Sequence, residues 1–298
     1  MLAGAPQARP WFEGPRGPKN RRSAARLWAS PGVRFGPFHM RLVTYDRGGQ
    51  RRLGAILEGE VVDLPDAVGH PAFPTTLEGL VSSSRGTVLD AARTALGRDD
   101  VFDWKVKRPR ILTPLFPTSL LSPGSLDVER RLIGPEHEVP WPTGAAWLEY
   151  EPKVAAVLGL ETSADDPFRS ERHLFGYTLV SDWQARDASG APVITADGVP
   201  IAIGPCVVTA DEIDPQVMFL QVRIDGEEIA KGNLNGTATS LFAAIEEASR
   251  IDPLGRGDAL ALNPFAARDW QLWAGAKVEL GAEGIGTLRN QIAVGLDH

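Results

Sequence analysis

Two carboxylates at the ends of short apolar runs are the clearest candidates for chemistry in this chain of 298 residues. Glu151 lies just before the apolar run 154–160, and Asp182 lies just after the run 174–180. Apolar runs of this length are typical of buried strands. If two such strands lie side by side, both carboxylates come together at one edge of a sheet, where they could hold a cation or a substrate.

The elements that must position these carboxylates belong to residues 108–298, for which the sequence predicts a β-rich domain. The segment 108–149 is rich in proline and is expected to be extended. Apolar residues alternate over 217–224, and an Asp-Gly turn returns the chain through 227–230. Thr237 or Thr239 is expected to open the one clear helix of this half, and 277–280 and 285–294 are expected to close the sheet.

Residues 40–107 are predicted to form a small N-terminal α/β domain. Short strands are expected at 41–45, 52–57 and 60–63, because turn residues separate these runs. Thr76 is expected to cap one helix, and a second helix is expected over 87–96. Phe102, Trp104 and Val106 alternate with polar residues, which predicts a half-buried strand leading into the next domain.

Composition limits the class of protein. A formal net charge of −7 argues against a nucleic-acid surface, and no apolar run is long enough to span a membrane. The single cysteine, Cys206, excludes an internal disulfide and suits a reducing, cytoplasmic setting. Residues 1–39 carry seven Lys and Arg against one acid. They are interpreted as a disordered tail, or as residues from an upstream start that precedes the real one at Met40. An organelle presequence and a basic arm are the alternatives.

Several motifs, in matching order and spacing from about residue 40 to the C-terminus, resemble the fumarylacetoacetate hydrolase superfamily. The most specific is SDWQARD at 181–187. The others are RLIGPEHEVPWP at 131–142, LEYE at 148–151, FGY at 175–177, the segment 203–213, LGRGD at 254–258 and GIGTLRN at 284–290.

The resemblance implies a folded mixed β-sheet in a β-rich α+β protein that pairs as a homodimer through its large domain. It also implies that a divalent cation is held by a Glu-x-Glu pair and by the aspartate of the SDWQARD string. That cation would polarise a 2-oxo acid or a 1,3-dicarbonyl compound, and a histidine on an upstream loop would activate water. Hard cations such as Mg²⁺ or Mn²⁺ suit such oxygen ligands.

This chain departs from the implied metal site at Lys153. Glu151 matches the first glutamate and Asp182 the aspartate, but Lys153 stands where the second glutamate is expected. An ammonium repels Mg²⁺ and Mn²⁺, and it would satisfy both carboxylates. Lys153 could supply the positive charge in place of the metal, so that no cofactor is needed. Alternatively, it could only repair a defunct site with a salt bridge.

Other parts of the implied site are altered as well. Residues 115–129 replace the upstream loop and contain no histidine, although Asp127 and Glu129 could reach the site. Asn263 and Pro264 stand where the resemblance implies a Gly-Thr pair that grips the substrate, and the lysine implied after Asp187 is missing. Water activation and the substrate clamp therefore change together with the metal site.

Several other residues also have expected roles. Arg186 and Asp187 are predicted to form an internal pair that positions Asp182. Trp183 could wall the pocket, although core packing is the usual role of tryptophan. Cys206 is interpreted as a buried structural thiol. Of the histidines, His137 is expected in an exposed turn and His173 at a strand entry, so neither is a strong candidate base.

Three functions remain open from the sequence. The first is an enzyme acting on a small 2-oxo acid or 1,3-dicarbonyl compound, in which Lys153 replaces the metal and the reaction is decarboxylation, isomerisation or cyclisation rather than hydrolysis. The second is a catalytically silent relative that binds a ligand or a partner protein. The third is a metal-dependent carbon–carbon hydrolase that uses only Glu151 and Asp182.

Overall fold

The computed structural model describes residues 39–83, 86–122, 131–163, 171–194, 198–236, 240–265 and 270–294. The predicted tail therefore lies almost entirely outside the described residues. The strands are β1 (Arg41–Arg47), β2 (Gln50–Leu57), β3 (Glu60–Asp63), β4 (Leu120–Leu121), β5 (Leu132–Ile133), β6 (Glu138–Val139), β7 (Trp147–Leu158), β8 (Leu174–Arg186), β9 (Ile201–Thr209), β10 (Leu220–Ile224), β11 (Glu227–Gly232), β12 (Ala259–Leu262), β13 (Gln271–Leu272), β14 (Lys277–Ala282) and β15 (Gly286–Ile292). The α-helices are α1 (Leu64–Val68), α2 (Leu77–Ser83), α3 (Thr87–Leu96) and α4 (Leu241–Ile251).

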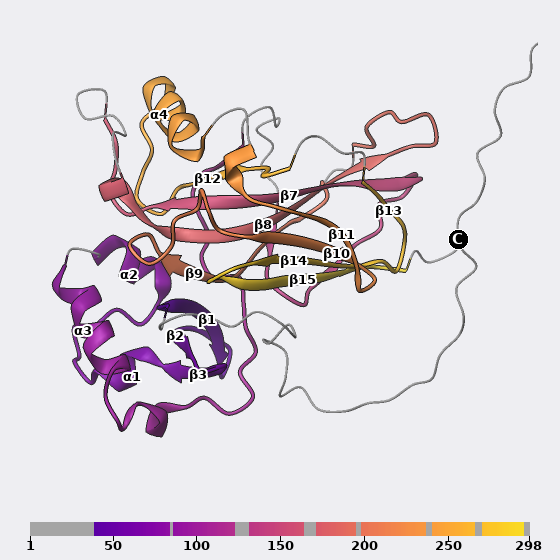
Figure 1. Cartoon of the computed structure of the whole chain (residues 1–298). Helices are drawn as coiled ribbons and strands as arrows, with labels where there is room; N and C mark the ends of the chain where they lie inside the picture. Colours follow the sequence, from indigo (N-terminus) through magenta and orange to yellow (C-terminus); the bar gives the residue numbers. More distant parts are fainter. Residues whose placement is uncertain are drawn as a thin grey trace, which may run out of the picture.

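One large mixed sheet carries the two strands that the sequence singled out. Its order is β3-β2-β1-β9-β8-β7-β12-β4, with β13 also paired to β7 and β5 paired to β9. β7 and β8 are long neighbours at its centre and run antiparallel. Most of their residues are buried, as their apolar runs predict. The structure confirms the β-rich α+β class (Figure 1).

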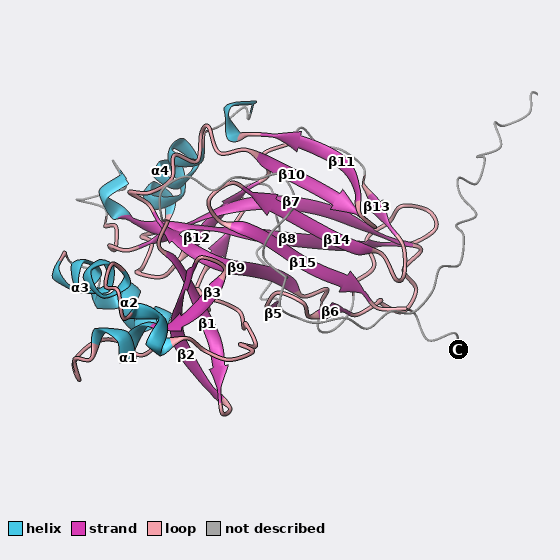
Figure 2. Cartoon of the chain, turned by 60° about the horizontal axis from the view of Figure 1, so that its bottom comes forward, coloured by secondary structure: helices cyan, strands magenta, loops and turns pink. Residues whose placement is uncertain are grey.

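A second sheet, in the order β11-β10-β14-β15-β6, packs against the first. The main core lies between the two sheets and includes Val154 and Leu179 from the large sheet and Val222 and Leu280 from the small one. Figure 2 shows the second sheet toward one end of the molecule, while α1, α2 and α3 gather at the other end beside β1, β2 and β3. β14 and β15 form the predicted closing hairpin, but they close this second sheet.

The small N-terminal region is continuous with the large sheet. β1 pairs with β9, so the hairpins β1–β2 and β2–β3 extend the sheet at that edge. α2 begins at Leu77 behind Thr76, whose Oγ1 accepts a hydrogen bond from the amide of Gly79 at 3.1 Å, and α3 covers Thr87–Leu96. These strands and helices lie where the sequence predicts them; the division at residue 107 stays a prediction.

Two predicted local features are wrong. The residues around Phe102 and Trp104 form a 3₁₀ helix, Val101–Trp104, in which the amide of Lys105 bonds back to the carbonyl of Phe102. Extended pairing with β3 starts only after that helix, because the amide of Val106 donates to the carbonyl of Val61. α4 is opened by Ser240, whose Oγ accepts from the amide of Ala243, and not by Thr237 or Thr239.

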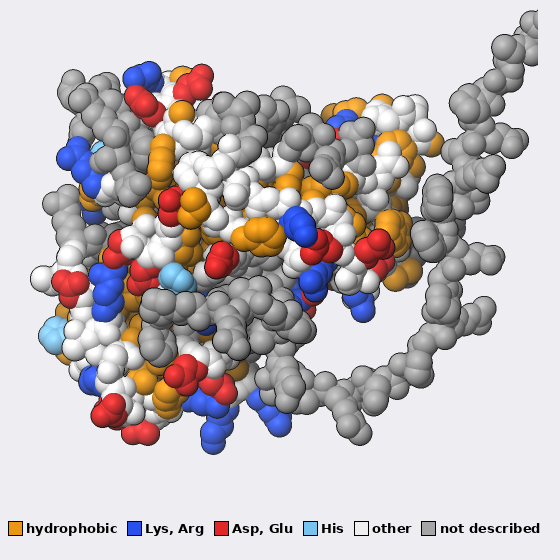
Figure 3. All heavy atoms as spheres, viewed as in Figure 1, with side chains coloured by type: hydrophobic (Ala, Val, Ile, Leu, Met, Phe, Trp, Pro, Cys, Tyr) orange, Lys and Arg blue, Asp and Glu red, His pale blue; other side chains and the backbone are white. Residues whose placement is uncertain are grey.

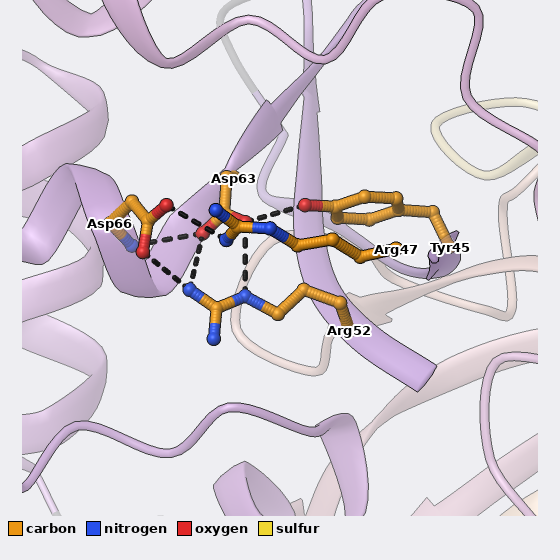
Figure 4. Close-up of polar contacts among 5 residues, drawn as sticks. All are labelled: Tyr45, Arg47, Arg52, Asp63 and Asp66. Atoms are coloured by element: carbon orange, nitrogen blue, oxygen red, sulfur yellow. Dashed lines mark hydrogen bonds and ion pairs between the residues drawn. The ribbon is translucent and has the colours of Figure 1, made fainter. Parts of the chain in front are cut away.

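A buried carboxylate, Asp63, ties the small region together (Figure 4). Arg52 donates to both of its oxygens at 2.9 and 3.0 Å, Arg47 donates at 2.7 Å, and the Tyr45 hydroxyl donates at 2.5 Å. Asp66 accepts from both guanidiniums as well, and its amide donates to Asp63, which caps α1. We call these five residues the Asp63 cluster.

The register of β1–β2–β3 explains how that cluster forms. Tyr45 lies opposite Arg52 on β2, and Asp63 lies opposite Gly54 on the same strand. A Cβ on Gly54 would meet Tyr45 at 3.1 Å and Val61 at 3.0 Å, so only glycine lets the tyrosine cross β2 this closely. The phenol therefore reaches Asp63 over the glycine.

No helix among the described residues is long and apolar enough to cross a membrane. On the face shown in Figure 3, acidic and basic side chains are mixed rather than gathered into a stripe of one sign. Stripes of one sign are the usual footprint of nucleic-acid binding.

Candidate functional site

The pairing of β7 with β8 places the two carboxylates opposite each other. Glu151 lies directly across from Asp182, and Lys153 lies across from Val180. Side chains alternate between the two faces of a strand, so Glu151, Lys153 and Asp182 all project from the same face. The opposite face of these strands enters the core between the sheets. Strand alternation is thus enough to bring the three charges together.

Lys153 bridges the two carboxylates. Its Nζ lies 2.7 Å from Asp182 Oδ2 and 2.9 Å from Glu151 Oε2. The side chains of Lys153 and Asp182 are each 3% exposed, whereas that of Glu151 is 36% exposed. The ammonium therefore lies beneath the surface, with one buried partner and one partner that solutes can reach. We call these three residues the Lys153 cluster.

Trp183 lies on the other face of β8. It pairs across the strands with Tyr150, stacks on it at a centroid distance of 6.1 Å, and is 1% exposed in the main core. On the same face, the Tyr150 hydroxyl meets Ser181 Oγ at 3.0 Å. The expectation that Trp183 walls the pocket is wrong, because neighbouring residues on a strand point to opposite faces.

The predicted Arg186–Asp187 pair is also wrong. Arg186 bonds Glu149 on β7 through Nε at 2.7 Å and Nη2 at 2.6 Å, and it also reaches Gln184 at 3.1 Å. Asp187 accepts hydrogen bonds from Ser189 and from the amide of Ala191, which closes the turn after β8. Arg186 braces the two strands, whereas Asp187 shapes the turn; neither contacts Asp182 through these bonds.

Sequence reasoning missed Glu149 and Gln184 as members of the polar face. Both follow from period-two alternation, because Glu149 lies two residues before Glu151 and Gln184 lies two after Asp182. The same face of β7 and β8 therefore carries two ion pairs in sequence along the strands, Glu149–Arg186 and then the Lys153 cluster.

The substituted clamp residues lie beside this face. The β12–β7 ladder ends with Leu262 opposite Val154, so Asn263 and Pro264 follow where Lys153 stands on β7. The Asn263 side chain accepts from the amide of Phe265 at 2.9 Å, and Pro264 is buried. Their role in binding a substrate stays a prediction. The other candidates in the upstream loop, Asp127 and Glu129, lie outside the described residues.

Other candidate groups have structural places. The Cys206 thiol is fully buried and donates to the carbonyl of Ile285, and burial raises its pKa to about 12. Such a thiol is not a nucleophile at neutral pH. His173 is buried directly before β8, as expected, and its carbonyl accepts from Gly159. His137 is half-buried in its turn, with Nδ1 3.2 Å from the carbonyl of Pro135.

The donor set of the Lys153 cluster does not suit a divalent cation. A hard cation needs several oxygen ligands, and here both carboxylates already contact an ammonium. Within the described ranges, no three His, Cys, Asp or Glu side chains come together in a group that could hold a metal ion.

A cavity of about 620 Å³ lies elsewhere, at the far ends of β7 and β8. Gly159 lines it and stands six residues beyond Lys153, which at the rise of an extended strand is about 20 Å. The cavity and the Lys153 cluster are therefore separate features.

Comparison with known proteins identifies the family. The sequence model described as fumarylacetoacetate (FAA) hydrolase C-terminal matches residues 102–293, more than half of the chain. The chain belongs to the fumarylacetoacetate hydrolase family. The resemblance seen in the sequence motifs is confirmed.

The relatives found within this family include proteins named for different activities. An uncharacterized protein of Pyrococcus abyssi is 26% identical over 187 residues, which cover 60% of this chain and 80% of that protein. The oxaloacetate tautomerase YisK of Bacillus subtilis is 29% identical over 157 residues, 49% of this chain and 52% of the tautomerase. The maleylpyruvate hydrolase of Sphingobium sp. SYK-6, solved with manganese(II) and pyruvate, has a TM-score of 0.67 at 20% identity and covers 86% and 100% of the two chains.

Proposed function

We propose that this family member is an enzyme that interconverts the keto and enol forms of a small 2-oxo acid or 1,3-dicarbonyl compound. The observation that carries the proposal is the ammonium of Lys153, held 2.7 and 2.9 Å from the carboxylates of Asp182 and Glu151. Those carboxylates match two of the three metal ligands that the family motif implies. A fixed positive charge thus stands in the region where the motif would place a cation.

Glu151 and Lys153 take part in the proposed reaction, and Asp182 holds the ammonium in place at 2.7 Å. Glu151, the exposed carboxylate, takes a proton from the carbon next to the substrate carbonyl. The electron pair of that C–H bond moves to form the carbon–carbon double bond, and the carbonyl electrons move to oxygen. Lys153 stabilises the resulting enolate, because an ammonium has three N–H donors and two face carboxylates. The protonated Glu151 then gives its proton to the enolate oxygen, which yields the enol and restores the carboxylate, so no water or leaving group is consumed.

Two features favour such a reaction over hydrolysis. The upstream segment 115–129 contains no histidine to activate water. One relative is named an oxaloacetate tautomerase, and tautomerisation needs only a base and a stabiliser of the enolate. Decarboxylation of a 2-oxo acid would instead form an enolate from the keto form, when the electron pair of the carbon–carbon bond to the lost CO₂ moves toward the carbonyl; Lys153 could stabilise that enolate as well. Cyclisation is a further alternative. We further propose that the enzyme is cytoplasmic and forms a homodimer, needs no metal, and binds neither nucleic acid nor membranes.

A catalytically silent relative is the alternative. Its supporting observation is that the Lys153 side chain is only 3% exposed, as expected for an ammonium that only pairs with two carboxylates and binds no substrate. A metal-dependent hydrolase ranks third, because it would require the ammonium to leave both oxygens.

The experiment follows the keto–enol equilibration of oxaloacetate by enol absorbance after the protein has been treated with a chelator. The unaltered chain is expected to accelerate it, and both Glu151→Gln and Lys153→Met should abolish the acceleration. Glu246→Gln, in an exposed ion pair on α4, serves as the control and should retain full activity. Equal rates with and without protein would contradict the tautomerase proposal. If the chelator-treated protein becomes active only after Mn²⁺ is added, that result would favour the metal-dependent enzyme.

A further inference from the structure

The separate cavity has a largely apolar wall. It lies where α3 meets the ends of β7, β8 and β9, and Leu89, Leu160, Leu174 and Phe175 line it. A volume of about 620 Å³ falls within the usual range for small-molecule sites, which occur preferentially where two parts of a protein meet. The wall can therefore accept the apolar body of a small ligand.

Among the residues that the structure describes, the polar groups that line the cavity are few. They are Arg93, Arg172, Thr209 and Asp211. Thr209 is 1% exposed, and its Oγ1 has no hydrogen-bond partner among the residues that the structure describes. A buried hydroxyl without a partner costs free energy that a ligand atom could restore. An apolar wall with a few polar groups is the usual composition of a binding site.

The charges favour an anionic ligand at the Arg172 end. Arg93 is surrounded by acids, with Asp211 at 2.6 Å, Asp90 at 3.5 Å and Glu212 at 3.9 Å, so an added anion would be repelled there. Arg172 is exposed and lies in the short 3₁₀ helix Glu171–His173, directly before β8. A guanidinium has five N–H donors, so it can bind a carboxylate in addition to other partners.

We propose that this cavity is a second ligand site, which binds a small organic acid with an apolar body and one carboxylate. The body lies against Leu160, Leu174 and Phe175, and the carboxylate is received by Arg172. The Thr209 hydroxyl supplies a further polar contact. The site is independent of the Lys153 cluster and does not depend on the function proposed for it.

The test compares 2-naphthoate with its neutral counterpart 2-naphthamide, using calorimetric titration and ligand-observed NMR on the full chain. The acid is expected to bind in the millimolar range or tighter, and the amide about tenfold more weakly, the loss expected for a charge-assisted contact. Arg172→Gln should weaken binding of the acid by about tenfold and leave the amide unchanged. Leu160→Trp, which fills the cavity, should abolish binding of both.

Three controls locate the ligand. Arg250→Gln removes an exposed arginine on α4 and should leave binding unchanged. Lys153→Met should also leave it unchanged; loss of binding in that variant alone would place the ligand at the Lys153 cluster and overturn this inference. If Leu160→Trp fails to fold, Leu89→Trp fills the cavity from α3 instead. Absence of binding at about 10 mM, or equal binding of acid and amide, would also overturn it.

Discussion

The Asp63 cluster and the Lys153 cluster are both buried charge networks on neighbouring antiparallel strands, but their charges balance differently. In the Asp63 cluster, two guanidiniums face two carboxylates, and a phenol adds a further donor (Figure 4). In the Lys153 cluster, one ammonium faces two carboxylates. The first network is neutral and satisfied by its own members, whereas the second carries an excess negative charge.

That difference in charge suits the two clusters to different roles, one in stabilising the fold and the other in catalysis. The Asp63 cluster is neutral and joins three strands to α1, so a structural role is enough to account for it: it stabilises the small N-terminal region. An unbalanced network costs more free energy to bury, and buried groups of that kind are often found at functional sites. The cations differ in kind as well. Arginine binds a carboxylate through two parallel hydrogen bonds, as Arg52 does with Asp63. Lysine is a compact charge with three N–H donors, and Lys153 contacts only two carboxylates.

The largest expected effect is a change of ligand at the Lys153 cluster. Lys153→Glu would rebuild the three-carboxylate set implied by the family motif, and we expect it to bind Mn²⁺ in calorimetric titration while the unaltered chain gives no heat. Lys153→Gln, which removes the charge without adding a ligand, is the matched control and should remain silent. Tight stoichiometric metal in the unaltered protein would contradict the assignment of Lys153 as the cation.

Asp63→Asn is expected to cause the largest loss of stability. It leaves Arg52 and Tyr45 without their shared acceptor, so the free energy of unfolding should fall by about 3–5 kcal/mol. Asp66→Asn is the matched control; its side chain is 33% exposed, and the loss should be about 1 kcal/mol or less. Urea denaturation measures both. Equal, small losses would show that the Asp63 cluster is not a support.

Lys153→Met is expected to cost less, about 2–3 kcal/mol at neutral pH, because Glu151 is partly exposed and water screens the repulsion that remains. Urea denaturation of both proteins at neutral pH measures the loss. A loss as large as that of Asp63→Asn would mean that water does not screen the two carboxylates.

The contribution of the Asp63 cluster to stability should be lost only in acid. Burial alone would raise the pKa of the Asp63 carboxyl, but hydrogen bonds from Arg52, Tyr45 and the amide of Asp66 outweigh it and hold the pKa below its ordinary value. A carboxyl with a lowered pKa stabilises the fold above the unfolded value of about 3.9, and that contribution is lost as pH falls through the folded value. The difference between the unaltered chain and Asp63→Asn should therefore persist at about pH 5 and vanish only below about pH 3.9.

The sequence could predict the Lys153 cluster because its geometry depends only on two neighbouring strands. Glu151 and Asp182 end apolar runs, and alternation places Lys153 on the same face. The Asp63 cluster could not be found so directly, because its members come from three strands and a helix whose register must be known first. Gly54, which lets Tyr45 reach Asp63, gives no local signal of that role.

The wrong assignments at the candidate site share one cause. Adjacency in sequence predicts that Trp183 lies beside Asp182 in the pocket and that Arg186 pairs with Asp187. On a strand, however, adjacent residues point to opposite faces, so the partner of Arg186 is Glu149 across the ladder. The 3₁₀ helix Val101–Trp104 is a different case, since its apolar alternation resembles a strand although no strand pairs with it.

The most direct test of Lys153 as the cation for an enolate is the binding of oxalate, a stable mimic of the enolate of a 2-oxo acid. Oxalate is titrated calorimetrically into chelator-treated protein, using the unaltered chain, Lys153→Met and Lys153→Arg. We expect binding in the millimolar range or tighter in the unaltered chain, weaker binding in Lys153→Arg and none in Lys153→Met. If the unaltered protein does not bind oxalate, or if Lys153→Met binds it equally well, the account is contradicted and the ammonium of Lys153 only forms a salt bridge with Glu151 and Asp182.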